Sequence, residues 1–166
     1  MSHSHLSTTA GWREWVALTN VGVPWVKAKL DTGARSSALH AFDVEEYAVG
    51  GAAWVRFGIR PWQDSEEDAQ IVELPVHDRR IIRSSSGHTM ERIVVLLDIT
   101  LLGRNITAEV SLSNRDEMGF RMLIGREALR QGFLVDSSVS FLGGRAPRRV
   151  RRTNRGKTQH TNLERV

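Results

Sequence analysis

The apolar residues of this chain come in short runs, and this spacing limits the fold more than any other feature. Between Trp12 and Leu142, runs of three to six residues rich in Val, Ile, Leu and Trp alternate with clusters of Gly, Pro, Asn, Asp and Ser. Short runs that end at turn-forming residues are typical of β-strands. The pattern therefore predicts an all-β domain.

The individual strands follow from these runs. We predict them at residues 14–18, 25–30, 37–41, 53–59, 71–76, 80–84, 92–101, 106–112 and 121–124. The segments 92–101 and 106–112 are joined by a short turn containing Gly103, which predicts a hairpin. One helix is predicted at residues 126–132, where good helix formers precede Gly132. Two polar stretches, residues 61–70 and 84–89, are predicted to be loops.

Length and composition predict one folded domain flanked by tails. The chain has 166 residues, of which 40% are hydrophobic, and it shows no internal repeat that would form a second lobe. Its apolar runs are too short to cross a membrane. We expect a disordered N-terminus over residues 1–11, a folded domain over residues 12–143 and a disordered basic tail over residues 144–166.

The N-terminus and the cysteine count bear on location and chemistry. The N-terminus has neither the basic nor the apolar region of a secretory signal, which predicts a cytoplasmic protein. Because the chain contains no cysteine, disulfides, thiolate zinc sites and a cysteine nucleophile are excluded.

The C-terminal tail holds much of the positive charge. Eight basic residues lie between Arg145 and Val166 against the single acidic Glu164, whereas the net charge of the whole chain is +4. A segment so poor in apolar residues is not expected to fold by itself. Two functions stay open for it: a solubilising tail, or contact with RNA, a ribosome surface or an acidic peptide through counterion release.

Two motifs carry most of the chemical information. A predicted strand ends at Asp31-Thr32-Gly33, but Asp and Gly are ordinary turn residues, so this tripeptide alone indicates only a hairpin. Far downstream, an apolar strand runs through Gly125 and Arg126 into the predicted helix. The two motifs in this order are a more specific signal than either one alone.

Together the motifs resemble the retropepsin-like aspartic peptidases. Residues 29–41 and 113–126 are similar to a bacterial branch often labelled "ATP-dependent zinc protease", which is associated with an ATP-grasp ligase that adds glutamates to a ribosomal protein. The resemblance covers residues 12–143. It implies an all-β, single-lobed, closed acid-protease barrel with one short C-terminal helix.

The resemblance also implies an active site. The catalytic residues would be Asp31, Thr32 and Gly33, supported by Ala34, Arg35, Asp116, Gly125 and Arg126. Peptide hydrolysis by carboxylates requires two Asp side chains that share one proton. Because this chain has a single Asp-Thr-Gly, the second carboxylate is expected from an identical subunit across a two-fold axis.

The sequence departs from the viral members of this class in two respects. An acidic residue often follows Asp-Thr-Gly-Ala there and pairs with the Gly-Arg arginine, whereas this chain has Arg35. Two arginines repel, so we expect Asp116 or Glu127 to take over the pairing. The interval between the motifs is also longer, which predicts an enlarged flap or an insertion. Its tip is expected at Ser86, Gly87 and His88, or alternatively within residues 61–70.

No cofactor is predicted. None of the six histidines forms a His-Glu-x-x-His pattern, and a metal site would require His40, His77 and His88 to converge in three dimensions. The chain has no Gly-rich phosphate-binding motif, so an ATP dependence would belong to a partner. The serines at residues 84–86 lack the glycines of a nucleophile elbow.

Two functions from different classes follow. The first is an aspartic endopeptidase that acts as a homodimer on peptides, including the glutamylated tails of a ribosomal protein. The second is a catalytically weak or inactive module that binds and regulates an ATP-grasp ligase or holds an acidic peptide. The expected partners are a second copy, a peptide or protein substrate, and the ligase or ribosomal protein. No membrane contact is expected, and nucleic acid would be contacted only through the basic tail.

Overall fold

Most of the described chain is β-structure. The computed structural model describes residues 6–83, 86–114 and 119–157. In chain order the strands are β1 (Thr8–Gly11), β2 (Arg13–Leu18), β3 (Val23–Asp31), β4 (Ser37–His40), β5 (Phe42–Val49), β6 (Ala52–Ile59), β7 (Gln70–Pro75), β8 (Asp78–Arg83), β9 (Thr89–Leu101), β10 (Arg104–Ser113), β11 (Met122–Gly125) and β12 (Phe133–Asp136). The helical elements are η1 (Thr19–Val21), α1 (Arg126–Leu129) and α2 (Arg148–Asn154).

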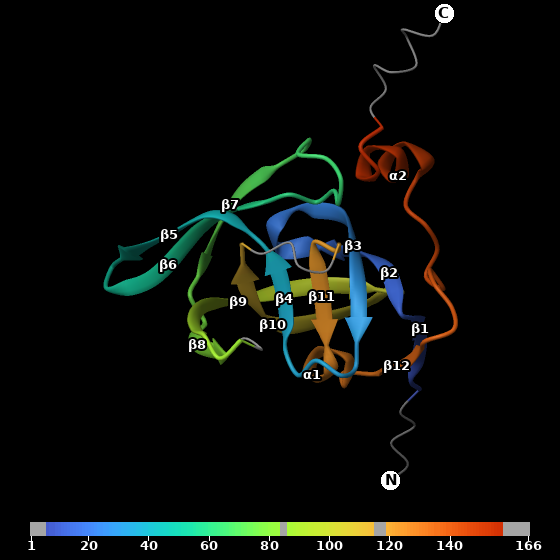
Figure 1. Cartoon of the computed structure of the whole chain (residues 1–166), viewed down its shortest axis with the longest axis horizontal. Helices are drawn as coiled ribbons and strands as arrows, with labels where there is room; N and C mark the ends of the chain where they lie inside the picture. Colours follow the sequence, from blue (N-terminus) through green and yellow to red (C-terminus); the bar gives the residue numbers. More distant parts are fainter. Residues whose placement is uncertain (1–5, 84–85, 115–118, 158–166) are drawn as a thin grey trace, which may run out of the picture.

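Six of the strands close into a barrel (Figure 1). Their order is β10-β4-β11-β3-β2-β9, and β9 pairs back onto β10, while β8 adds to β9 outside the ring. A closed ring leaves none of its own strand edges unpaired. The closed all-β barrel with a short helix after the second motif is thereby confirmed.

The barrel closes around an aliphatic core because its strands alternate. In β3, Val26, Ala28 and Leu30 are buried in this core, whereas Lys27 and Lys29 are half-buried on the outer face. Successive side chains of a strand point to opposite faces. Asp31, two residues beyond Lys29, therefore shares the outer face with the two lysines.

Each predicted strand has a counterpart in the structure, and the hairpin of β9 and β10 is confirmed. Three strands were not predicted: β1, β5 and β12. β5 is mostly exposed and carries Asp43, Glu45 and Glu46, so it lacks the apolar alternation that marks a half-buried strand. It pairs with β6 in a separate three-stranded sheet, β5-β6-β7.

The predicted disorder at the two ends was wrong in part. Residues 8–11 form β1, which runs parallel to β12, because the short strands complete each other's backbone hydrogen bonds. Residues 148–154 form α2, which packs Val150 against Trp15 and Trp62. Neither α1 nor α2, the α-helices of the described residues, has the length and apolar character needed to cross a membrane.

Candidate active site

The two sequence motifs lie side by side in the barrel wall. β11 runs between β3 and β4 (Figure 1). It is parallel to β3, with Gly125 opposite Asp31, and antiparallel to β4, with Leu123 opposite Ala38. The loop that joins β3 to β4 therefore passes over the end of β11, at the point where α1 begins.

Asp31 ends β3 with its carboxylate held by its own loop. The Gly33 N–H donates to Asp31 Oδ1 at 2.9 Å, and the Ala34 N–H donates to the Asp31 carbonyl at 3.2 Å. Asp31 is half-buried, whereas Thr32 and Gly33 are exposed. The carboxylate is thus oriented by the backbone at a tip that a second molecule can approach.

The same loop supplies acceptors for the start of α1. The Arg126 N–H donates to the Ala34 carbonyl at 2.7 Å, and the Glu127 N–H donates to the Arg35 carbonyl at 3.1 Å. The first N–H groups of a helix have no partner within the helix. The β3–β4 loop therefore replaces a side-chain cap, and these hydrogen bonds fix the loop to α1.

Gly125 is required by the closeness of these segments. A Cβ on Gly125 would lie 2.4 Å from the Ser36 carbonyl oxygen and 2.9 Å from that of Ala34. Its N–H donates to the hydroxyl of Ser37 at 3.0 Å, and Ser37 is buried. Sequence reasoning identified Gly125 but missed Ser37, which is recognisable only once β4 is seen beside β11.

The charged residues of the loop pair differently from the expectation. Glu127 Oε1 lies 2.9 Å from Arg35 Nε, and this hydrogen bond holds the pKa of Glu127 below its usual value. Arg126 instead donates from Nη1 to the Thr32 carbonyl at 3.4 Å. Glu127 therefore pairs with Arg35 rather than with Arg126. Asp116, the other expected partner, lies outside the described residues.

Two cavities flank the loop on the side of β8. One, of about 450 Å³, is lined in part by Arg35, Ser36 and Ile81. The other, of about 230 Å³, shares Ser36 and Ile82 with it. Asp31 lines neither cavity. Residues of β8, of β9 and of the C-terminal end of the β3–β4 loop line these cavities, so the hairpin of β8 and β9 lies beside that end of the loop.

The two flap candidates differ in how they are held. Ser86, Gly87 and His88 are exposed at the tip of the hairpin of β8 and β9, and Gly87 has a φ of +86°. Residues 61–70, in contrast, are tied to α2, since the Gln63 N–H donates to Asn154 Oδ1 at 2.8 Å. The second candidate, residues 61–70, is therefore joined to the C-terminal segment.

Glu109 is a charged residue beside the site that sequence reasoning missed. Its Oε2 accepts from Arg80 Nη2 at 2.7 Å, and its Oε1 lies 2.8 Å from His77 Nε2. The contact with Arg80 and, next, the contact with His77 lower the pKa of Glu109. Glu109 also lines the larger cavity, so a fixed negative charge lies near Arg35.

The histidines occupy separate places. His40 is buried at the end of β4, His77 contacts Glu109, and His88 is at the hairpin tip. Within residues 6–83, 86–114 and 119–157, no three His, Asp or Glu side chains gather as ligands for a metal ion.

Glu14 is a second residue that the sequence did not single out. It is fully buried, and its carboxylate accepts from the backbone N–H groups of Gly11 at 2.6 Å, Leu142 at 2.9 Å and Gly143 at 3.0 Å. A buried charge must be compensated in this way. Glu14 therefore fastens both ends of the domain to β2.

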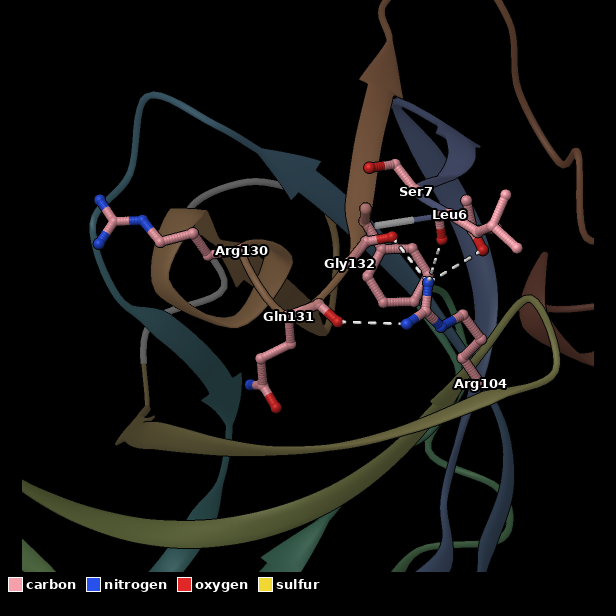
Figure 2. Close-up of a pocket in the computed structure, with 8 residues that line it drawn as sticks. Leu6, Ser7, Arg104, Arg130, Gln131 and Gly132 are labelled. Carbon is pink, nitrogen blue, oxygen red and sulfur yellow. Dashed lines mark hydrogen bonds between the residues drawn. The ribbon is translucent and has the colours of Figure 1, made fainter. Parts of the chain in front are cut away.

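Arg104 fastens the N-terminal segment from the other side (Figure 2). It lines an open cavity of about 910 Å³, and its Nη1 donates to the carbonyls of Leu6 at 3.1 Å and Gly132 at 2.9 Å and to Thr8 Oγ1 at 3.2 Å. These acceptors are all neutral. The cavity is thus a junction between the turn of β9 and β10 and the two-stranded sheet of β1 and β12.

The closed six-stranded barrel, crossed by the β3–β4 loop, has the single-lobed retropepsin-like fold. The family model described as "Retropepsin-like aspartic endopeptidase RimB" matches residues 9–146. The chain belongs to this RimB-like family.

Several known proteins are similar to the chain. A "probable alpha-L-glutamate ligase" of Shewanella pealeana is 43% identical over 134 residues, which cover 81% of this chain. A protein of the same description from Desulfotalea psychrophila is 35% identical over 84% of this chain. The chain spans only 29% and 30% of the length of these two relatives. A crystal structure of a Legionella pneumophila protein of unknown function is 28% identical, with a TM-score of 0.69, and the match covers 82% of this chain and 98% of that one.

Proposed function

We propose that the chain is an aspartic endopeptidase whose active site forms from two copies. The observation that carries this proposal is the position of Asp31, which is oriented by the Gly33 N–H on an exposed loop tip. An isologous two-fold contact brings identical residues together across its axis. The dyad would consist of Asp31 and Asp31 of the partner subunit.

The chemistry follows from a pair of carboxylates with one proton between them. The ionised carboxylate takes a proton from a water molecule, whose oxygen attacks the peptide carbonyl carbon, while the protonated carboxyl donates to the carbonyl oxygen. The carboxyl that took the proton from water then passes it to the amide nitrogen, a hydroxyl of the tetrahedral intermediate returns its proton to the other carboxylate, and the C–N bond breaks. Gly33 would keep the carboxylates aligned, and the hairpin tip at Gly87 would close over the peptide.

The substrate class of this proposal is an acidic peptide. Arg35 and Arg126 flank the loop, and Lys29 shares the outer face of β3 with Asp31. Cations in these positions attract glutamate side chains. The relatives' description as glutamate ligases supports a glutamylated tail, such as that of a ribosomal protein, as the substrate.

Replacing Asp31 tests the proposal. In a turnover assay with a quenched glutamate-rich peptide, Asp31→Asn should lower kcat by roughly a hundredfold or more, since the remaining groups cannot exchange the proton. Asp43→Asn, an equal change at an exposed site in β5, is the matched control and should leave kcat unchanged. Equal turnover by the two variants would refute the peptidase assignment.

A regulatory module is the second candidate, and the length of the relatives favours it. The chain corresponds to less than a third of a probable glutamate ligase. A non-catalytic domain would bind such a ligase through its surface. In that case the native chain would bind the ligase saturably without cleaving any peptide, and Asp31→Asn would leave the binding unchanged.

A further inference from the structure

The segment that follows the barrel is rich in cations and is ordered. Seven basic residues and no acidic residue lie between Arg145 and Lys157. Arg145, Arg148, Arg149, Arg155 and Lys157 are exposed. The proposed catalytic chemistry uses none of these residues.

Contacts with the barrel hold this segment in place. Ala146 and Val150 are buried against Trp15 and Trp62. Asn154 is 1% exposed, and its Nδ2 donates to Gln63 Oε1 at 3.0 Å. The cations of α2 are therefore presented from a fixed helix rather than from a flexible tail.

The barrel adds further cations around Phe141. Arg13 and Arg145 place their guanidinium carbons 5.0 and 5.1 Å from the Phe141 ring centroid, and Lys27 Nζ lies 5.7 Å from it. Burial lowers the pKa of Lys27 and the charge of Arg13 lowers it further, whereas the charge of Asp64 raises it and those of Arg155 and Arg145 lower it. Arg13, Lys27 and Arg145 thus surround one ring, with the carboxylate of Asp64 also close to Lys27.

Along β3, this region is far from the β3–β4 loop that carries the Asp-Thr-Gly motif. Trp25 packs with the cluster under α2, and Asp31 follows six residues later, which is about 20 Å in a strand. Figure 1 shows α2 and α1 at opposite ends of the molecule in that view. A ligand on α2 would leave Asp31 uncovered.

We propose that this surface, defined as the basic face and formed by Arg13, Lys27, Arg145, Arg148, Arg149 and Arg155, binds the phosphate backbone of structured RNA. Guanidinium groups match phosphate oxygens in pairs. A rigid array of cations releases counterions from an equally rigid array of phosphates. A flexible acidic peptide would lose more conformational entropy on binding to α2 than an RNA that is already structured. Trp15 and Trp62 are buried, and cations surround the Phe141 ring, so these rings are not free to stack on bases. Binding is therefore through phosphates and independent of base sequence.

Binding of a fluorescent RNA stem-loop by the full chain tests this inference. Arg149→Gln combined with Arg155→Gln should weaken binding on the order of tenfold and reduce the slope of log affinity against log salt by roughly two. The matched control, Arg56→Gln with Arg130→Gln, removes the same charge from other exposed positions and should have little effect. Arg149→Lys with Arg155→Lys keeps the charge and should keep most of the salt slope.

Three results would overturn the inference. The first is binding by the native chain that is absent or insensitive to salt. The second is an equal loss of affinity in the basic-face variant and its control. The third is displacement of the RNA by a poly-glutamate peptide of equal charge at lower concentration, which would assign the basic face to acidic protein segments. Circular dichroism of each variant separates lost binding from lost structure.

Discussion

Asp31 is positioned by small residues that allow backbones to approach, not by long side chains. Gly33 turns its N–H onto the carboxylate, and Gly125 lets the loop cross β11. Glu14, on the other side of β3, satisfies three backbone donors at once. The two glycines can be predicted from their sequence motifs. Glu14 cannot, because the fold alone brings its distant hydrogen-bond partners to it.

Adding a methyl group distinguishes the two glycines. Gly125→Ala forces a Cβ against carbonyl oxygens of the backbone, which should lower the free energy of unfolding by about 2 kcal/mol. Gly33→Ala places a Cβ 3.2 Å from Asp31 Oδ1, which a rotation of that side chain can relieve. Urea unfolding should therefore show little change for Gly33→Ala, while its peptidase activity falls. Equal stability losses would contradict this difference.

Glu14→Gln tests the buried carboxylate. Both carboxylate oxygens of Glu14 accept hydrogen bonds from backbone N–H groups, so the side-chain NH2 of the glutamine would face a donor where an oxygen now accepts. This change should lower the free energy of unfolding by about 2 to 3 kcal/mol. Glu67→Gln, at an exposed position, is the control and should be neutral. A neutral Glu14→Gln in urea unfolding would mean that the three hydrogen bonds contribute nothing.

At the scale of elements, α1 and α2 are both short helices that depend on what they contact. The β3–β4 loop caps α1, and the packing of Val150 against Trp15 and Trp62 holds α2 on the barrel. Isolated helices of this length are not stable in water. Tertiary packing therefore decides whether either one forms.

The anchor of α2 is open to a direct test. Val150→Asp places a charge against Trp15 and Trp62 and should release α2 from the barrel. The tryptophan emission should then shift to the red, as the two rings become hydrated. Arg149→Asp, one position away on the exposed side, should leave the emission in place. A spectrum of Val150→Asp identical to that of the native chain would contradict the docking of α2.

The stability that the contact between the β3–β4 loop and α1 provides should depend on pH. Because the hydrogen bond from Arg35 lowers the pKa of Glu127 in the folded chain, its contribution is present above the ordinary glutamate pKa and is lost as pH falls through the lowered value. Glu127→Gln should accordingly have a slightly lower Tm than the native chain at neutral pH and the same Tm in strong acid. A difference that grows toward acid would have the wrong sign.

Several of the strands that the sequence predicted show apolar alternation. β2, β3, β9 and β10 all have buried residues at alternate positions, and each was found. β1, β12 and α2 were missed because their stability comes from pairing or docking between distant segments. The same limit applies to the candidate site. Asp31 and Gly125 were singled out by their motifs, whereas the pairing of Glu127 with Arg35 could not be predicted, because it depends on the contact between the β3–β4 loop and α1.

At the scale of the whole molecule, the proposed peptidase site requires a second copy of the chain. One chain has one Asp-Thr-Gly tip, and its neighbouring cavities are lined by the loop exit and β8 rather than by Asp31. The sheet of β1 and β12 leaves Leu134 59% exposed. The basic face lies near the start of β3, whereas Asp31 ends this strand.

An exchange of subunits separates a shared dyad from a site within one chain. Native chain and Asp31→Asn chain would be exchanged in varying ratios at constant total concentration, and peptide turnover measured for each mixture. If each site needs both carboxylates, activity follows the square of the native fraction, so an equal mixture retains about a quarter of the activity. Activity that falls linearly with the native fraction would show that each chain works alone and would contradict the shared dyad.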